Sequence, residues 1–521
     1  MAKASAPNIV TLSPTQLEEL LTKLTPLLPT EIYQLIEKSL RTLQWLMRLI
    51  EAKETSLGRL QRLIFGAKTE KTKQLFPPAT SRSGPATAGK LKGHGRTAAA
   101  GYTGAKQVRV PHPQLRPGDA CPGCKEGKLY RLKQLGQIVR ITAQPLFVAT
   151  RYELEKLRCK LCGQVFSAPA PKEAGLAKYD PQVGPMLGYL RFGMGLPHYR
   201  LDKMQVDLGV RLAASTQWEL MAQAGQALEP VHEALLTMAA RGKVIHNDDT
   251  AVRVQSLVRE VDPTASGPER TGIFTTGLVS HVEGHTIALF LTGHRHAGEN
   301  LDQLLARRPA DCLPPIQMCD ALSRNPSKEF QTILANCLSH GRRQFVDIAQ
   351  DFPEQCQRVL EDLGQVYKHD AQAKDLELSP EARLSFHQQH SQKVLDELRA
   401  WMRQQLAQKL VEPNSGLGDA CNYMLKRWEP LTLFLRQAGA PLDNNICERS
   451  LKMAILHRKN SLGYKTHNGA RLGDMFMSLI HTCRLCAVNP LDYLYTLQRH
   501  AKEALEHPTE WLPWNYASDT S

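Results

Sequence analysis

From residue 241 onward, three strand-like segments follow one another before the first helix-like segment, and this order constrains the fold more than any other feature. β-Branched residues and alternation mark strands at residues 244–254, 272–279 and 285–291, then a helix near 299–307 and a further strand at 316–320. Successive strands followed by alternation of helix and strand are typical of a mixed α/β sheet. The sequence therefore predicts a mixed α/β domain in this part of the chain.

Two of these predicted strands carry an acid, and a third acid begins a predicted helix. Asp248 lies at the middle of the first strand, Asp320 ends the fourth, and Glu448 falls in the first or second turn of a helix that Asp443 or Asn444 could cap. Two Mg²⁺ ions held by a few carboxylates can activate the attacking oxygen and stabilise the leaving oxygen in phosphoryl transfer. Three acids among 51 Asp plus Glu are weak evidence by themselves, because nearly all such residues are solvated surface charges.

Ordered motifs surround these acids and extend toward the N-terminus. They are Leu63–Lys71, Leu196–Arg200, His246–Thr250, Cys337–Phe345, Asp443–Arg449 and Arg458–Asn460. Together they resemble the signature of the insertion sequence sixty-six family of transposases, in the same order and over most of the chain. The chain departs from the usual pattern of that family at Asp249, Ala321–Leu322, Leu338–Ser339 and Ser461–Gly463. These departures leave the three acids in place and indicate a divergent branch.

The resemblance implies a multidomain α/β protein with a ribonuclease H-like catalytic domain, here residues 241–470. In it, Asp248, Asp320 and Glu448 would coordinate Mg²⁺ or Mn²⁺ for DNA cleavage and strand transfer. The 128 positions from Asp320 to Glu448 exceed one strand–helix unit, and the helical composition of residues 347–435 predicts an all-α insertion there. Strand alternation turns Asp249 away from Asp248, so we expect Asp249 to be a supporting or a surface acid.

Positive charge points to a polyanionic partner. The formal net charge is +14, and residues 76–118 contain many Lys and Arg among Gly, Ala, Pro and Ser. Such a segment is expected to be a flexible basic linker, which could lie along DNA or act only as a tether. Candidate DNA contacts beside the acid motifs are His340, Arg342, Arg343, Arg449, Lys452, Arg458 and Lys459. Each of them, taken alone, is equally compatible with a solvated surface charge.

Four of the twelve cysteines have metal-ligand spacing. Cys121 and Cys124 form one C-x-x-C pair, and Cys159 and Cys162 form another. Four thiolates at this spacing suit tetrahedral Zn²⁺, with redox chemistry or chance pairing as the alternatives. Alternating residues at 137–143 and 145–153 predict strands between the pairs, so we expect a zinc ribbon over residues 119–166.

The remaining regions read as helical. Residues 1–75 contain a seven-residue apolar repeat, which favours a coiled coil, either as a dimer zipper or as an intramolecular hairpin. Residues 167–240 outline a helix-turn-helix or an ordinary helical hairpin, and residues 471–521 a helical tail. No N-terminal signal segment or long apolar run is present, so we expect a cytoplasmic, nucleoid-associated protein without a membrane partner.

The sequence thus predicts a bacterial DNA transposase that binds terminal inverted repeats and joins them to target DNA. The expected cofactors are Mg²⁺ or Mn²⁺ and Zn²⁺, and the expected partners are double-stranded DNA, further copies of the chain and accessory proteins of the same element. Two alternatives stay open. One is a catalytically inactive zinc-ribbon protein that only binds DNA, and the other is a hydrolytic nuclease of the same fold that never joins strands.

Overall fold

A computed structural model provides the structure of the chain. It describes residues 14–27, 29, 32–34, 36–41, 72–75, 102, 105–132, 137–141, 146–162, 164–175, 177–258 and 272–516. Two compact units are present. The first comprises Met1–Pro78, Leu236–Ala251 and Asp262–Lys452, and the second comprises Ala79–Leu235, Val252–Val261 and Met453–Ser521.

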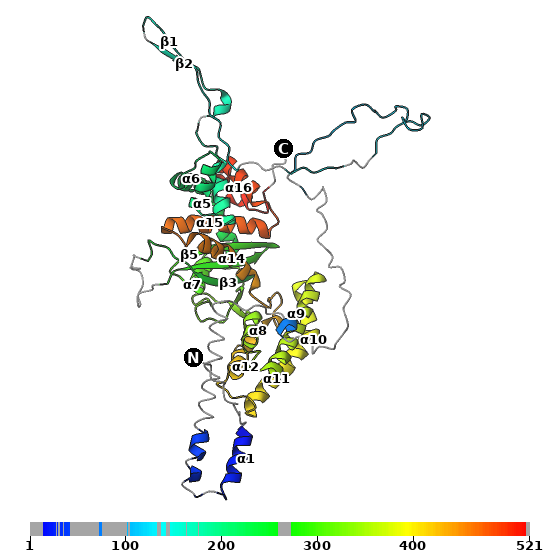
Figure 1. Ribbon diagram of the computed structural model, residues 1–521, viewed down its shortest axis with the longest axis vertical. Coiled ribbons are helices and arrows are strands. Elements are labelled where there is room, and N and C mark those ends of the chain that lie inside the picture. Colours follow the sequence, from blue (N-terminus) through cyan, green and yellow to red (C-terminus); the bar gives the residue numbers. More distant parts are fainter. Residues whose placement is uncertain are drawn as a thin grey trace, which may run out of the picture. The chain divides into compact units, whose positions relative to one another are not determined.

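A five-stranded mixed sheet forms the centre of the first unit (Figure 1). Its strands are β3 (Val244–Ala251), β4 (Phe274–Val282), β5 (His285–Gly293), β6 (Ile316–Cys319) and β7 (Ile333–Asn336). The order is β5-β4-β3-β6-β7, with β3, β4 and β5 antiparallel and β3, β6 and β7 parallel. The mixed α/β sheet expected from the strand pattern is confirmed.

Local sequence explains how the antiparallel half of the sheet forms. Glu283 and Gly284 join β4 to β5 with positive φ angles of 49° and 82°, as a tight two-residue hairpin requires. Helix α7 (Ala297–Leu305) then packs against β3 and β4. The Glu299 side chain accepts the His296 N–H at 2.8 Å and so fixes the start of α7.

Helix α14 (Asn445–Ser461) approaches the sheet closely at one glycine. Gly277 of β4 pairs with Asp248 of β3, and a Cβ at position 277 would lie 2.9 Å from Leu451 of α14. The Cys447 thiol donates to the Gly277 carbonyl at 3.2 Å. A side chain at position 277 would therefore push the first turns of α14 away from the sheet.

The long segment between β7 and α14 is helical. Its elements are α8 (Leu338–Asp347), α9 (Pro353–Asp375), α10 (Pro380–His390), α11 (Gln392–Ala407), α12 (Gly416–Lys426), α13 (Trp428–Leu431) and η4 (Leu433–Leu435). Their apolar faces form one core that continues to Ile316 and Met318 of the sheet. Asp370 of α9 is buried in this bundle and pairs with Lys374, Arg383 and His387.

Helices also form the core of the second unit. They are η2 (Lys172–Ala174), α4 (Val183–Gly188), η3 (Tyr189–Gly193), α5 (His198–Asp207), α6 (Ala214–Ala240), α15 (His467–Leu485), α16 (Pro490–Arg499), α17 (Ala501–Glu506) and η5 (Pro508–Trp511). Phe192 stacks on Phe476 with ring centroids 5.7 Å apart. Gly209, with φ 74°, makes the turn between α5 and α6, so a helix, a glycine turn and a second helix lie where the sequence outlined them.

The strands expected at 137–143 and 145–153 are wrong for the residues that the structure describes there. Residues 137–141 and 146–153 have no regular structure, and the Ile138 side chain is 98% exposed. Alternation makes a strand only when a partner and a buried face are available. The antiparallel hairpin lies later instead, in β1 (Lys156–Arg158) and β2 (Val165–Ser167).

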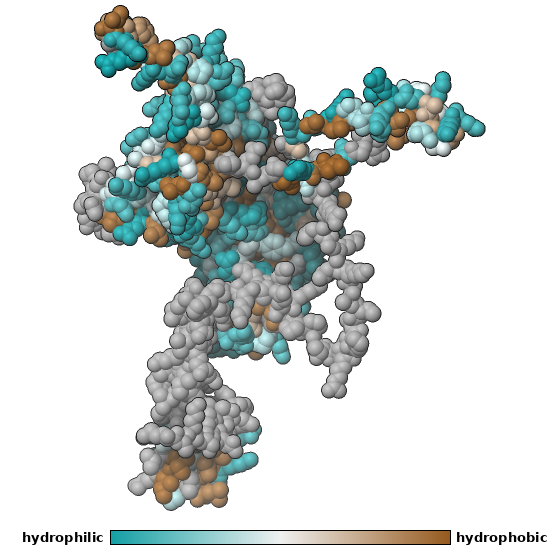
Figure 2. Space-filling view, turned by 45° about the horizontal axis from the view of Figure 1, so that its top comes forward, coloured by the Kyte–Doolittle hydropathy of each residue, from teal (hydrophilic) through white to brown (hydrophobic). Residues whose placement is uncertain are grey.

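The β1–β2 hairpin exposes apolar side chains. Leu161, in the turn of the hairpin, is 98% exposed, and Figure 2 shows hydrophobic residues at the hairpin tip. Burial of such a side chain against a partner is favourable by about 1.5–3 kcal/mol. This surface is therefore suited to packing against another element.

Near the N-terminus, α1 (Pro14–Leu24) and the four-residue helix α3 (Thr72–Leu75) are described. The coiled-coil repeat expected within residues 1–75 lies mostly outside the described residues. Residues 76–101 of the expected basic linker also lie outside them. No helix within the described ranges combines the length and apolar character needed to cross a membrane.

Candidate active site

Asp248 lies on β3, and Asp320 directly follows the neighbouring strand β6. β3 and β6 pair in parallel with Val244 opposite Ile316, and each acid lies four residues beyond its member of that pair. Adjacent strands are about 4.8 Å apart, and residues of equal register point to the same face. Asp320 therefore lies at the end of the strand next to that of Asp248, and its charge is among those that raise the pKa of Asp248.

The pKa of Asp248 reports that acids gather around it. Burial, followed by the charges of Asp320, Asp249 and Glu448, raises this pKa to about 7. The Asp249 N–H donates to Oδ1 of Asp248 at 2.8 Å and opposes the rise. Like charges in a poorly hydrated place repel one another, so a bound cation would stabilise the ionised forms.

Asp320 is held by the loop that follows β6. Its Oδ1 accepts the Leu322 N–H at 3.2 Å and a short hydrogen bond from the side chain of Asn325. Asn325 is itself fixed, because its carbonyl oxygen accepts the side-chain amides of Asn247 at 2.7 Å and Gln317 at 2.8 Å. The loop thus ties Asp320 back to β3 and β6.

Asn444 fixes the start of the helix that carries Glu448. It is fully buried, and its side chain bonds to His246 Nδ1 at 3.0 Å and to the Asn247 carbonyl at 3.1 Å. Its backbone N–H donates to the Cys337 sulfur at 3.2 Å. Glu448 lies in the first turn of α14, four residues after Asn444. The helix start is therefore attached to β3 within two residues of Asp248.

His340, expected as a DNA contact, lies next to Glu448. Its Nδ1 is 3.8 Å from Glu448 Oε1, beyond hydrogen-bond distance, and neither atom has a hydrogen-bond partner in the part of the chain that the structure describes. Within the described parts of the chain, Cys337, His340 and Glu448 form the one group of at least three metal-ligating side chains whose ligand atoms all lie within 4.8 Å of one another. The donors present around Glu448 fit a divalent cation.

Asp249 is buried and paired, so the surface alternative for this acid is wrong. Its side chain is 1% exposed, and its two oxygens bond to His296 at 3.1 Å and to Arg324 at 3.0 Å. These partners come from the start of α7 and from the loop after Asp320. Asp249 therefore links β3 to the loop that carries Asp320.

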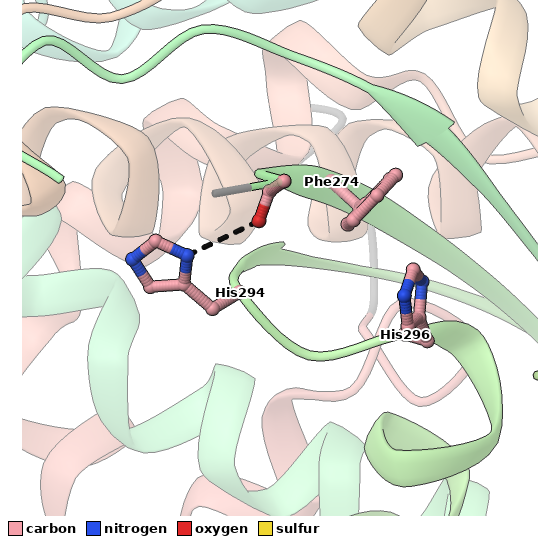
Figure 3. Close-up of a pocket in the computed structure, with 4 residues that line it drawn as sticks. Phe274, His294 and His296 are labelled. Atoms are coloured by element: carbon pink, nitrogen blue, oxygen red, sulfur yellow. Dashed lines mark hydrogen bonds between the residues drawn. The ribbon is translucent and has the colours of Figure 1, made fainter. Parts of the chain in front are cut away.

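A hollow of about 300 Å³ adjoins this ion pair, at the ends of β4 and β5 (Figure 3). It is lined by Gly272, Phe274, His294 and His296. His294 Nδ1–H donates to the Gly272 carbonyl at 3.1 Å, and the rings of Phe274 and His296 lie 4.3 Å apart. Because His296 also bonds to Asp249, the hollow lies on the Asp249 side of β3.

The other expected DNA contacts lie on α8 and α14. Arg342 and Arg343 are half-buried on α8, and Arg342 donates to Thr72 at 3.3 Å. Arg449 and Lys452 are exposed and three residues apart on α14, so they share one face of that helix. Arg458 is half-buried and Lys459 is exposed in the last turn of α14.

Each cysteine pair forms a tight turn of its own. Cys121 N–H donates to the Gly127 carbonyl at 2.7 Å, and Cys159 N–H donates to the Gln164 carbonyl at 2.9 Å. The N–H groups of Gly127 and Glu126, followed by the Cys121 thiol, lower the pKa of Cys124. A lowered pKa favours the thiolate form that metals bind. In the described chain, however, the four sulfurs do not form one cluster.

Sequence reasoning missed the contact between His340 and Glu448. The spacing Cys337-x-x-His340 resembles the bite of a metal-binding pair, and this signal could have found it. Nothing in the sequence indicated Arg324 as the partner of Asp249, because their separation of 75 residues is closed only by the fold.

Comparison with known proteins supports one family. The model of the family described as "Transposase IS66 family" matches residues 179–472, which include Asp248, Asp320 and Glu448. Two similar proteins of Sinorhizobium fredii (strain NBRC 101917 / NGR234) are named uncharacterized protein y4hP and uncharacterized protein y4jD. The first is 25% identical over 90% of this chain and 89% of its own length. The second is 24% identical over 91% of this chain and 96% of its own length.

Proposed function

This chain belongs to the IS66 family of transposases, whose model matches residues 179–472, and from that membership we propose that it cuts the ends of a bacterial insertion sequence and joins them to target DNA. The placement of Asp248 on β3 and of Asp320 directly after the neighbouring parallel strand β6 carries this proposal. Glu448 completes the set from the first turn of α14, close enough for its charge to raise the pKa of Asp248.

The proposed chemistry assigns a role to each acid. Asp248, Asp320 and Glu448 would hold the divalent cations through their carboxylate oxygens. Mg²⁺ or Mn²⁺, when bound, would activate the attacking oxygen and stabilise the leaving oxygen. The protein would hold the carboxylates at fixed separations and keep the phosphodiester in line with them. Asp249 would position the Asp320 loop through Arg324.

We propose that the domain is ribonuclease H-like. The strand order β5-β4-β3-β6-β7, with three antiparallel strands followed by two parallel ones, supports this assignment. It agrees with the fold that the family resemblance implied. The helices from α9 to η4 would then be an insertion between the second and third acids.

We propose that basic residues bind the DNA. Arg449 and Lys452, exposed on one face of α14 beside Glu448, would contact phosphates, as would Arg342, Arg343, Arg458 and Lys459. The helix pair α5–α6 would act as a helix-turn-helix at the element ends. Self-association through residues 1–75 and help from accessory proteins are further proposals, which a mass measurement and a pull-down with neighbouring gene products would test.

We also propose that Zn²⁺ joins the two cysteine turns into one zinc ribbon. The two hairpin-like turns, the lowered pKa of Cys124 and the exposed apolar side chains of β1–β2 support it. Four thiolates would leave no open coordination position, so this Zn²⁺ would be structural.

Cleavage and strand transfer on DNA with the element's inverted repeats test the proposed activity. We expect Asp248→Asn, Asp320→Asn and Glu448→Gln each to lose both products by at least about 100-fold, because each removes a charged metal ligand. All three should still bind the DNA. Glu329→Gln, which removes an exposed acid of the same unit, is the matched control and should remain active.

The alternatives give different products. A hydrolytic nuclease would cut the repeats but would yield no joined product when supplied with a free 3′-hydroxyl and a target plasmid. An inactive DNA-binding protein would bind the repeats without cutting them, even with its neighbouring gene products added. A fully active Asp320→Asn variant would remove Asp320 from the site.

A further inference from the structure

His340 and Glu448 face each other across a gap that no hydrogen bond fills. His340 Nδ1 and Glu448 Oε1 are 3.8 Å apart and have no hydrogen-bond partner among the described residues, although both atoms are shielded from solvent. Leaving a buried donor or acceptor unpaired costs about 1–3 kcal/mol, and more for a charged group. Both atoms therefore remain available as ligands of a third group.

The separation suits two ligands of one cation. Imidazole nitrogen and carboxylate oxygen bind a divalent ion at about 2.0–2.2 Å, so two such atoms can lie up to about 4 Å apart on one ion. A direct hydrogen bond would need less than about 3.2 Å. The observed 3.8 Å is thus too long for the bond, and at these metal distances it corresponds to an angle of about 130° between the two ligands on one ion.

Hydrogen bonds between backbone segments hold the two ligands in place. His340 lies in the first turn of α8, where its N–H donates to the Cys337 carbonyl at 3.2 Å. Leu338 N–H donates to the Leu442 carbonyl at 3.0 Å, just before α14. Asn444 N–H donates to the Cys337 sulfur at 3.2 Å. The starts of α8 and α14 are therefore fixed relative to each other, as preorganised metal ligands need to be.

We propose that His340 and Glu448 bind the same divalent cation, which makes this position a mixed nitrogen and oxygen site that prefers Mn²⁺ and other transition-metal ions to Mg²⁺. The inference rests on the proposed function, because it names the cation for one position of the same site. His340 then acts as a metal ligand instead of a phosphate contact.

The preference follows from the donor atoms. Mg²⁺ takes oxygen ligands almost exclusively, whereas imidazole suits first-row transition ions. Cys337, 1% exposed, closes one side of the position, with its sulfur already accepting the Asn444 N–H. It therefore lines the site without being required as a ligand.

Mn²⁺ binding to the full-length protein tests the proposal. Mn²⁺ is the probe because it is paramagnetic and has little affinity for the thiolates of the cysteine pairs. Pulsed electron paramagnetic resonance should detect histidine nitrogen coupled to bound Mn²⁺ in the parent protein. The signal should vanish in His340→Gln and in Glu448→Gln, and persist in His390→Gln, which changes an exposed histidine of the same unit.

Affinity gives a second readout. Loss of a supporting partner alone weakens metal binding by about 10–100-fold, so His340→Gln should lower Mn²⁺ affinity at least about 10-fold. Its Mg²⁺ affinity should change less, and the preference for Mn²⁺ should therefore shrink. Thermal unfolding without metal would establish that the variants are folded.

Three results separate this inference from the proposed function. Absence of nitrogen coupling in the parent protein, or its persistence in His340→Gln, overturns the shared cation even when the protein cuts and joins DNA. Full activity of His340→Gln with the parent's preference for Mn²⁺ also overturns it. Nitrogen coupling that depends on His340, in a protein that never joins DNA, supports the metal site and removes the transposase activity.

Discussion

Asn444 is the residue that brings the helix of Glu448 to the strand of Asp248. Its side chain uses both the amide oxygen and the amide nitrogen, and its backbone N–H reaches Cys337. His246, one of its partners, has a pKa lowered to about 3 by burial and by His281. It is therefore neutral near pH 7, and its Nδ1–H donates to the Asn444 oxygen.

We predict that Asn444→Ala destabilises the protein by about 1–3 kcal/mol, because it leaves the His246 ring and the Asn247 carbonyl buried without this partner. Cleavage should fall as well, since α14 loses its attachment to β3. Denaturant unfolding measures the first effect. Asn445→Ala is the matched control, because the Asn445 side chain bonds only to nearby Asp443. Equal losses of stability in the two variants would contradict this role for Asn444.

His457 of α14 provides a test of pH dependence in the second unit. The ring is 1% exposed, lies 4.5 Å from the Tyr464 ring, and has no hydrogen-bond partner at either nitrogen among the described residues. Burial, followed by the charges of Arg191 and His198, lowers its pKa to about 3. The unfolded chain takes up this proton near pH 6.5. Above pH 6.5 the neutral His457 ring therefore makes its full contribution to the free energy of unfolding. This contribution is lost as the pH falls from 6.5 toward 3, because only the unfolded chain takes up the proton there.

We predict that His457→Phe raises the unfolding temperature, and raises it more at pH 5 than at pH 8. Phenylalanine keeps the ring contacts, removes two unpaired buried nitrogens and has no proton to take up. The gain should be about 2–4 °C for each kcal/mol. Thermal scans at both pH values measure it. His507→Phe, at an exposed histidine of the same unit, should leave the pH dependence unchanged.

At the scale of elements, the two cysteine turns are the parts that most need a bound partner. Each is closed by its own backbone hydrogen bonds, yet the hairpin β1–β2 has no buried side chain. Structural zinc sites supply folding free energy directly. The two turns therefore depend on metal more than the helical core does.

We predict that native mass spectrometry detects one Zn²⁺ in the parent chain and none after Cys121→Ser or Cys159→Ser. Either change should also increase proteolysis within residues 119–166. Cys312→Ser, a partly buried cysteine of the first unit, is the control and should keep the ion. Zinc that survives both single changes would contradict a shared four-cysteine site.

Elements that bury a regular face could be predicted from the sequence. The prediction failed for segments that have no partner to define a buried face. β3 to β6 could be predicted, because apolar alternation or buried runs mark them. Residues 146–153 alternate in the same way but remain irregular, with Val148 exposed. The strand order in the sheet could not be read from periodicity, because pairing depends on contacts between distant segments.

In the candidate site, too, sequence motifs could be recognised, whereas contacts between distant segments could not be predicted. Motifs were sufficient to single out Asp248, Asp320 and Glu448 as candidates, and their role in catalysis stays a prediction. The orientation of His340 toward Glu448 could not be predicted, since it depends on how the starts of α8 and α14 meet. The burial of Asp249 also depends on a distant partner, Arg324.

At the scale of the whole molecule, the net charge of +14 predicts salt-sensitive DNA binding. Six to ten neutralised phosphates would weaken binding by about 10³–10⁵-fold between roughly 50 and 200 mM salt. Fluorescence anisotropy with inverted-repeat DNA measures this dependence. Arg449→Ala and Lys452→Ala should each lower the salt slope by about 1. Lys393→Ala, an exposed lysine of the helical insertion, should not. An unchanged slope in the first two variants would remove them from the DNA interface.

The wide spacing of the acids along the chain also sets how long, during synthesis, the first acid exists without the third. Asp248 and Glu448 are 200 positions apart (448 − 248). A ribosome adding about 5–20 residues per second needs about 10–40 s to pass from one to the other. During that interval the growing chain holds β3 with its acid, while the segment that would dock on Gly277 has not been made. On the proposed assignment, an unfinished polypeptide therefore lacks the third acid and cannot cut DNA.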